Sequence, residues 1–387
     1  MGRYVLLFLT TVAAGPGFAQ TKPLVRVGDG KSANYEGRVD SLDKTSVTMT
    51  QRDGRIVMLK RSVVKKVETV AKTFRPFAKS EVVSALREEF GSKFVVKTSQ
   101  HYVVVVPKSS RTNYAAVFES VYGAFHYQFR RRKFHLQRTE FPLVAIVFSN
   151  FKDFARYAAK DGVRASPGLL GYYHRLSNRV AVYESNRTSL KTTPDTRSGF
   201  IADATKAVAD ILDTGANATL ASTITHETIH QVSFNTGLHP RLGHAPRWLI
   251  EGLEMTFESP GFLSTKDARG SSRINRSRFV WFKNYQQRRR RKGSLKTFIE
   301  SGSLFTTGTL DAYSQAWALT FFFMDQPARS YKFGQYVRAM NKRDLTQGYN
   351  AKERLRDFES AFGDIDRLEV QFLRFMDQLD PNSVTTR

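Results

Sequence analysis

Two histidines four positions apart constrain the fold of this chain more than any other feature. In the stretch His226-Glu227-Thr228-Ile229-His230, a helix would project both imidazole rings from one face, because an α-helix has about 3.6 residues per turn. Two rings in this arrangement can bind one zinc ion, while Glu227 lies beside the metal and is free to act as a general base. We therefore expect a metal-binding helix that contains this motif.

The residues around the motif predict where this helix begins and ends. Asn217 and Thr219 are capping residues ahead of an apolar series, and Asn235-Thr236-Gly237 is typical of a helix end. A second, shorter helix is predicted from Pro246 to Glu258, since proline is favoured in the first helical turn and Ser259-Pro260-Gly261 interrupts the pattern. One loop joins the two helices, so the second can bring a further ligand to the first.

Glu251 on the second helix is the expected third metal ligand. It follows His230 by 21 positions, and Gly252 next to it would let the helix approach another backbone closely. A zinc ion that catalyses hydrolysis keeps three protein ligands and one open position for water, and two neutral imidazoles with one carboxylate meet this need. Glu254 remains open as an alternative ligand or as a residue that orients a liganding imidazole. Glu258 is expected to be a solvated or packing residue.

These two helices also carry a family resemblance. His226-Glu227-x-x-His230 followed by Trp248-Leu249-x-Glu251-Gly252-Leu253 resembles the gluzincin metallopeptidases, in particular the uncharacterised secreted bacterial branch of the peptidase-MA-like group, and the resemblance extends from about Phe94 to about Asp325. It implies a zincin-type domain with a mixed sheet, whose edge strand precedes the motif helix, and an active-site cleft beneath that strand. It also implies a tyrosine or histidine that stabilises the oxyanion. Tyr313 is the best match for that role, and the alternative is that its ring only packs against Trp317.

The motif and the resemblance together predict a zinc-dependent peptidase. Glu227 would accept a proton from the zinc-bound water, and the zinc ion with Tyr313 would stabilise the oxyanion. An endopeptidase is favoured, because no glycine-rich signature that anchors a substrate amine precedes the motif. Two alternatives remain open: a catalytically inactive protein that keeps the zincin fold for binding, and a polyanion-binding surface protein whose zinc is structural. Among the other histidines, which show no metal-ligand spacing, His174 is the one weighed as a substrate contact.

The N-terminal residues predict an exported protein. Met1-Gly2-Arg3 is a basic region, residues 4–14 are apolar, and Gly17-Phe18-Ala19 has small residues at the positions of a cleavage site, so residues 1–19 are expected to be a signal peptide. A periplasmic or secreted location follows, and no later stretch reaches the roughly 18 apolar residues of a transmembrane helix. The chain has no cysteine, which leaves histidine and carboxylate as its only strong metal ligands.

The formal net charge of +25 indicates an acidic partner or environment. The clusters Arg130-Arg131-Arg132-Lys133 and Arg288-Arg289-Arg290-Arg291-Lys292 could bind an acidic polysaccharide or an anionic membrane or wall surface, which would associate the protein with the cell envelope. The simpler interpretation, which we favour, is a solvated charged face. No recognisable nucleic-acid module accompanies these clusters, so specific nucleic-acid binding is not expected.

The region from residue 24 to residue 70 is predicted to be a small β domain. Residues 46–50 alternate in polarity, and Asp53-Gly54 is a turn pair, so residues 56–59 are predicted to form the second strand of a hairpin. An earlier strand is predicted at residues 35–39. The pattern resembles the SH3-like barrels attached to exported bacterial enzymes. Its role is open between binding or anchoring and a structural cap on the larger domain.

Residues 76–380 are predicted to form one α+β domain, in which a mixed sheet and the motif helix precede a helical C-terminal lobe. Residues 141–148 form a nearly continuous apolar run, typical of a buried strand, whereas residues 179–183 alternate and favour a half-buried edge strand. A peptide substrate could add itself to that edge through backbone hydrogen bonds, with little sequence preference. The region from residue 304 to residue 379 has periodic apolar faces and is predicted to be helical.

Overall fold

The computed structural model describes residues 22–28, 34–166, 168–184, 218–264, 270–343 and 348–380. The predicted signal peptide lies outside the described residues. The chain is a mixed α+β protein with an N-terminal β-sheet region and a helical C-terminal part. It divides into two compact units, of which the first holds the described residues up to Arg75 except 53–57, and the second holds the remainder.

The first unit is built on a five-stranded sheet with the order β4-β3-β2-β1-β5. Strand β1 pairs antiparallel with β2 and β5, and β2 pairs antiparallel with β3. Its small core contains Val25 and Val27 of β1 and Val47 and Met49 of β3, which alternate along their strands as a half-buried sheet requires. The strands are β1 (Leu24–Gly28), β2 (Asn34–Leu42), β3 (Ser46–Gln51), β4 (Ile56–Lys60) and β5 (Lys66–Ala71).

The second unit contains a mixed sheet with the order β6-β7-β8-β10-β9. The three inner strands run parallel, whereas β6 and β9 pair antiparallel with their neighbours at the two edges. These strands are β6 (Phe94–Thr98), β7 (Tyr102–Pro107), β8 (Leu143–Phe148), β9 (Gly171–His174) and β10 (Arg179–Tyr183).

The prediction that residues 179–183 form an edge strand was wrong. Strand β10 lies between β8 and β9, and all five of its residues are buried. The alternation that suggested an exposed edge comes from Arg179, whose guanidinium is satisfied inside the fold by the carboxylate of Glu89 at 2.7 and 2.9 Å. The edge is therefore β9, which joins β10 through a tight turn.

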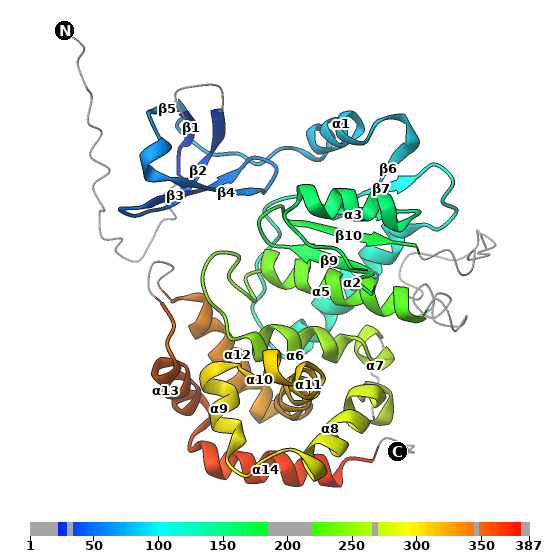
Figure 1. The fold of residues 1–387 in the computed structure, drawn as a ribbon, viewed down its shortest axis with the longest axis vertical. Helices are drawn as coiled ribbons and strands as arrows, with labels where there is room; N and C mark the ends of the chain where they lie inside the picture. Colours follow the sequence, from blue (N-terminus) through cyan, green and yellow to red (C-terminus); the bar gives the residue numbers. More distant parts are fainter. Residues whose placement is uncertain are drawn as a thin grey trace. The chain divides into compact units, whose positions relative to one another are not determined.

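Helices cover both faces of this sheet (Figure 1). Val103 and Val105 of β7 face a core formed with α1 (Lys79–Phe90) and α3 (Phe151–Lys160). Val104 and Val106 point to the opposite face, where α2 (Tyr114–Arg131) and α5 (Ala218–Asn235) pack. The two faces follow from the period of two in a strand. Helix α5 thereby lies on the sheet beside its edge strand β9.

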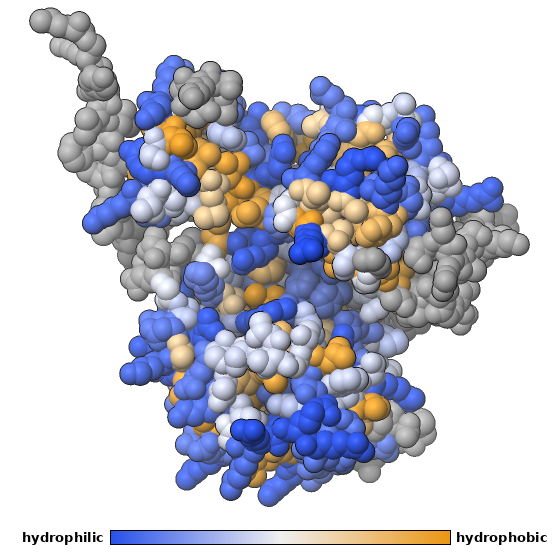
Figure 2. Space-filling model, in the orientation of Figure 1, coloured by the Kyte–Doolittle hydropathy of each residue, from blue (hydrophilic) through white to orange (hydrophobic). Residues whose placement is uncertain are grey.

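The helical C-terminal part is arranged around α11, a helix with buried residues on all sides of its last three turns. It packs against α6, α8, α12 and α14. In the view of Figure 2, hydrophilic residues cover most of these helices, with apolar ones scattered between them. The α-helices are α6 (Arg247–Phe257), α7 (Pro260–Leu263), α8 (Arg276–Arg288), α9 (Ser294–Ser301), α10 (Leu304–Thr307), α11 (Thr309–Asp325), α12 (Pro327–Asn341), α13 (Ala351–Phe362) and α14 (Ile365–Gln378).

Short 3₁₀ helices occupy Arg61–Val63, Gly91–Lys93 and Gly270–Arg273. Within the described part of the chain, no helix combines the length and apolarity needed to cross a membrane.

Candidate metal centre

Helix α5 presents His226 and His230 side by side. Their Nε2 atoms lie 3.1 Å apart, and the two rings meet nearly at right angles. The helix is fixed on the sheet by its buried residues Ile229 and Val232 and by Gln231, whose Nε2 donates to backbone carbonyls of β8 and the β9–β10 turn at 3.0 and 2.8 Å. The imidazoles on the opposite face of α5 are thus held by a helix that has little freedom to turn.

Helix α6 brings Glu251 to the two imidazoles, as the sequence predicted. Oε2 of Glu251 lies 3.7 Å from Nε2 of His226 and 3.8 Å from Nε2 of His230. The two Nε2 atoms, which lie 3.1 Å apart, and Oε2 of Glu251 form a triangle. The centre of this triangle lies about 2.1 Å from all three atoms. Zinc binds histidine nitrogen and carboxylate oxygen at about 2.0–2.2 Å. The three residues could therefore hold one transition-metal ion.

Gly252 allows α6 to reach this position. A side chain there would collide with the carbonyl of Ala316 and the hydroxyl of Thr320 on α11. The expected close approach of this helix to another backbone is confirmed, and the backbone it meets belongs to α11. Because Glu251 precedes Gly252 directly, the crossing of α6 and α11 sets how far the carboxylate extends towards α5.

Two further carboxylates hold the outer nitrogens of the imidazoles. Nδ1 of His226 lies 3.0 Å from Oε1 of Glu258, and Nδ1 of His230 lies 3.2 Å from Oε1 of Glu254. With a metal bound, each Nδ1 would carry the proton and each Nε2 would turn its lone pair to the shared point, which is the tautomer that a metal requires. Between the two roles left open for Glu254, the geometry favours orientation of an imidazole over direct ligation.

Of the two roles expected for Glu258, solvated or packing, the structure excludes the solvated one. Its side chain is only 12% exposed, and Oε2 accepts a hydrogen bond of 2.8 Å from Asn275 and faces Arg278 at 3.7 Å. Burial opposes its ionisation, but the hydrogen bond with His226 and the neighbouring charges outweigh burial and lower the pKa of Glu258. A sequence signal existed, since Glu251, Glu254 and Glu258 follow the i, i+3, i+7 spacing of one helix face.

The charge of Glu251 is stabilised despite its burial. Burial would raise the pKa of this carboxyl, but the neighbouring His226, His230 and Arg247 lower it to about 2. Nε of Arg247 lies 3.5 Å from Oε1 of Glu251, one helical turn away on α6. Glu251 is thus ionised at neutral pH, as a metal ligand must be. Fully buried Glu254 behaves differently, because burial raises its pKa.

Glu227 is joined to the edge strand by a hydrogen bond. Its Oε2 accepts a hydrogen bond of 2.7 Å from the backbone N–H of Tyr173 in β9. The contact is close because β9 has a glycine where α5 crosses it: a Cβ on Gly171 would lie 2.6 Å from Val182 and 2.9 Å from Thr223 of α5. The carboxylate is therefore held between the motif helix and the edge of the sheet.

Tyr313 reaches the site through Arg247. Nη2 of Arg247 donates to the phenol oxygen at 3.3 Å, while Nε of the same guanidinium faces Glu251. The ring of Tyr313 meets Phe305 edge-on at 5.6 Å, whereas Trp317 stacks on Phe321. The structure brings Tyr313 to the residues around the metal site by way of Arg247, a residue that sequence reasoning missed. Its i, i+4 spacing from Glu251 was the available signal.

Two other histidines lie near the site without joining the three ligands. His239 is buried behind the site, with Nε2 3.9 Å from Oε1 of Glu254, and burial lowers its pKa to about 3. His174, at the end of β9, pairs through Nδ1 with Oδ1 of Asp161 at 3.1 Å. His239 is consequently neutral and packs against the outer carboxylate, and His174 is held towards Asp161.

Comparison with known protein families gives a match to part of the chain. A family model described as a protein of unknown function (DUF1570) matches residues 220–345. This span contains His226, Glu227, His230, Glu251 and Tyr313. No curated protein matches the chain.

Proposed function

We propose that this protein is a zinc-dependent peptidase of the gluzincin type that hydrolyses peptide bonds in the exported compartment. The observation that carries the proposal is the position of three donor atoms about 2.1 Å from a common point, on two helices that also supply a carboxylate for each outer imidazole nitrogen. The mixed sheet, the motif helix on it and the helical part that follows support the zincin-type fold.

Each residue of the site has a role in this proposal. His226, His230 and Glu251 hold the zinc ion, which when bound supplies a water molecule of lowered pKa and a positive charge next to the substrate carbonyl. Glu227 accepts a proton and later passes it to the leaving amine. Tyr313 donates its hydroxyl proton to the developing oxyanion. Arg247 donates to the phenol oxygen, which leaves that proton free to point away from Arg247.

The edge strand β9 supports a peptide as the substrate. Tyr172 and His174 of β9 lie opposite Ala181 and Arg179 of β10, and the carbonyl of Leu170 accepts a hydrogen bond from the backbone N–H of Tyr183. In an antiparallel pair, alternate residues turn their backbone N–H and C=O groups to the other side. In β9 these residues are Gly171 and Tyr173. The outward N–H of Tyr173 is the one that binds Glu227. An extended peptide that adds to this edge would run beside the proposed base and bind mainly through its backbone, which predicts weak sequence specificity.

Export of the protein and the role of the N-terminal unit belong to the same proposal. The sequence of residues 1–19 supports a signal peptide, and the strand order β4-β3-β2-β1-β5 is compatible with an SH3-like domain for binding or anchoring. The alternative of an inactive zincin-fold binding protein receives no support from the site, because Glu227 is present and ordered at the edge strand.

The test combines metal content with turnover. Elemental analysis of the purified chain should find about one zinc per chain, and His230→Ala and Glu251→Ala should lose it. Glu227→Gln should keep the zinc and lose about a hundredfold to ten-thousandfold in the hydrolysis of a quenched peptide library. The exposed Glu88→Gln is the matched control. A folded protein that takes up no zinc, or full turnover in Glu227→Gln, would overturn the proposal.

A further inference from the structure

A second site lies apart from the metal centre. A cavity of about 400 Å³ is bounded by the C-terminal end of α2, the 3₁₀ helix Gly270–Arg273 and the junction of α11 and α12, and none of its lining residues belongs to the metal centre. Four cationic side chains and one carboxylate line it: Arg131, Arg132, Lys133, Arg273 and Asp325. Its volume falls in the range of about 300–1,000 Å³ that is usual for small-molecule sites.

The basic cluster Arg130-Arg131-Arg132-Lys133 spans the C-terminal end of α2. Lys133 adopts φ 58°, a left-handed conformation that is uncommon for a residue with a side chain. Arg132, the residue before it, lies against the protein, where Nη1 donates to the carbonyl and the side-chain oxygen of Gln128 at 3.0 and 2.7 Å. Its guanidinium lies 5.0 Å from the ring centre of Phe262. Part of this cluster therefore lines the cavity. The prediction of a solvated charged face holds only for the rest of it.

Among the described residues that line the cavity, four cationic side chains face one carboxylate. Nη2 of Arg273 donates to Asp325 at 2.7 Å, while its buried Nε has no hydrogen-bond partner among the residues that the structure describes. Burial and the charges of Arg273 and Arg131 lower the pKa of Arg132 to about 10. Like charges so placed repel one another, and a bound anion would relieve that repulsion.

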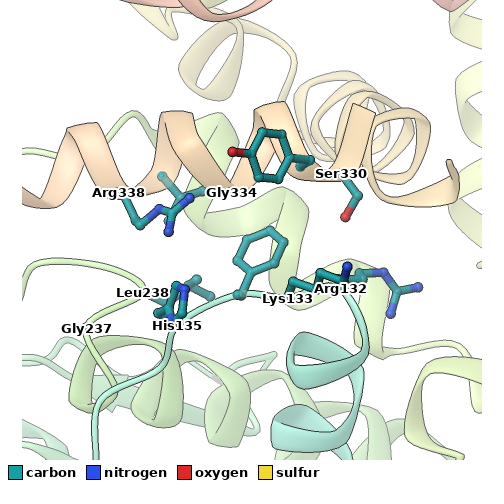
Figure 3. Close-up of a pocket in the computed structure, with 11 residues that line it drawn as sticks. Arg132, Lys133, His135, Gly237, Leu238, Ser330, Gly334 and Arg338 are labelled. Atoms are coloured by element: carbon teal, nitrogen blue, oxygen red, sulfur yellow. The ribbon is translucent and has the colours of Figure 1, made fainter. Parts of the chain in front are cut away.

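The remaining walls offer an apolar surface beside the cations. Met324, Pro327 and Tyr331 line the cavity, and the ring of Tyr331 is exposed. An adjoining crevice shares Arg132, Lys133, Ser330 and Tyr331 with the cavity and continues along α12 (Figure 3). In Figure 3, Arg132 and Lys133 lie at one end of this crevice, and Arg338 and His135 at the other. A ligand with an anionic group and an organic part would therefore find partners for both.

We propose that this cavity binds a phosphoester, with the phosphate between Arg131, Lys133 and Arg273 and the organic part against Tyr331. Guanidinium groups bind phosphate oxygens through paired N–H donors, and lysine adds a point charge, which makes phosphate the anion that suits this set best. The phosphoester can be soluble, as in a sugar or glycerol phosphate, or it can be the headgroup of a phospholipid. The proposal does not depend on peptidase activity.

Calorimetric titration of the full chain with glycerol 3-phosphate tests the site. Binding should weaken by about tenfold or more in the double variant Arg131→Gln/Lys133→Gln, whose two side chains are exposed and leave the core unchanged. Arg273→Gln should weaken it as well. The double variant Arg291→Gln/Lys292→Gln removes the same charge from the other basic cluster and should bind as the unmodified protein does. An equal loss in both double variants, or binding that survives in both, would overturn the proposal.

Vesicle flotation distinguishes the two sources of phosphate. Vesicles of phosphatidylcholine with and without phosphatidylglycerol are mixed with the same proteins. Capture by the anionic vesicles that is lost only in Arg131→Gln/Lys133→Gln supports the proposal with a lipid headgroup as ligand. Titration with glycerol 3-phosphate that succeeds without vesicle capture supports it with a soluble phosphoester. Failure of both probes refutes it, and zinc content and peptide hydrolysis should be unchanged in these variants throughout.

Discussion

The carboxylate of Glu227 and the backbone N–H of Tyr173 are joined by a hydrogen bond of 2.7 Å between the motif helix and the edge strand. The donor is a main-chain group, so the contact depends on the distance between α5 and β9 and not on the side chain at position 173. Any change that separates the helix from the strand should therefore weaken this contact of the proposed base.

Gly171→Ala tests this dependence. The added Cβ would lie 2.6 Å from Cγ1 of Val182 and 2.9 Å from Cγ2 of Thr223, so α5 or β9 must shift. We expect the free energy of unfolding to fall by about 1–3 kcal/mol, as for other overpacked positions. Peptide hydrolysis should fall while zinc content is kept. Urea denaturation, elemental analysis and turnover measure the three effects.

The control for Gly171→Ala adds the same methyl group in open space. Gly123 lies on the exposed side of α2, where a Cβ would meet nothing within 4 Å. Gly123→Ala should leave turnover unchanged and stabilise the protein by about 0.5–1 kcal/mol, because alanine is the better helix former. Equal behaviour of the two variants would show that the approach of α5 to β9 imposes no constraint.

Glu258→Ala should weaken zinc binding although Glu258 is not expected to touch the metal. Its Oε1 lies 3.0 Å from Nδ1 of His226 and orients that ring. Loss of such an outer partner commonly costs about tenfold to a hundredfold in metal affinity. Glu258→Gln should recover most of the affinity, because the amide oxygen can still accept the proton of Nδ1. Competition with a chelator measures the zinc affinity of each variant. Equal affinity in the unmodified protein, Glu258→Ala and Glu258→Gln would contradict the orienting role.

The sequence predicted the parts of the site that depend on local periodicity. His226, His230 and Glu251 meet as expected because two of them share one helix face and the third follows after a single loop. The hairpin at residues 46–59 was likewise confirmed by β3, β4 and the left-handed Gly54 between them. In each case the determining interactions lie within a few residues of one another, where patterns of polarity carry the information.

The errors concern residues whose partners are distant in the sequence. Strand β10 was placed at the edge because residues 179–183 alternate in polarity. The partner that allows Arg179 to be buried is Glu89, 90 positions earlier. Glu258 was expected only to be solvated or to pack, because Asn275, on the loop before α8, could not be foreseen as its partner. A single sequence gives the polarity of such residues but not the tertiary contact that makes their burial possible.

Arg290→Ala should destabilise the fold strongly, although the residue belongs to a basic cluster that we expected to be solvated. Its side chain is 3% exposed and pairs with Glu369, whose carboxylate also accepts from the backbone N–H groups of Gly293 and Leu295 at 2.8 and 3.0 Å. Removal of the guanidinium leaves a buried carboxylate without its counter-charge, which typically costs about 3–5 kcal/mol. Exposed Arg291→Ala should stay within about 0.5 kcal/mol of the unmodified protein in urea denaturation.

His126 should make the protein less stable as the pH falls from 6.5 towards 4. Burial, with the charges of His101 and Arg130, lowers the pKa of His126 to about 4 in the folded state from 6.5. Between these values the unfolded chain binds the proton and the folded protein does not, so acidification favours unfolding, and the contribution is fully present above pH 6.5. His126→Phe should remove this part of the pH dependence in urea denaturation, whereas His135→Phe, at an exposed position, should not.

Tyr313→Phe separates the two interpretations of the phenol. The variant keeps the edge-on packing of the ring against Phe305 and removes only the hydroxyl that accepts from Arg247 at 3.3 Å. If the hydroxyl stabilises the oxyanion, kcat should fall by about a hundredfold to a thousandfold, with zinc content and KM nearly unchanged, because the interaction forms only in the transition state. A kcat equal to that of the unmodified enzyme would assign Tyr313 to packing. Tyr331→Phe, which changes an exposed tyrosine of α12 outside the metal centre, is the control for loss of a phenol and should keep full turnover.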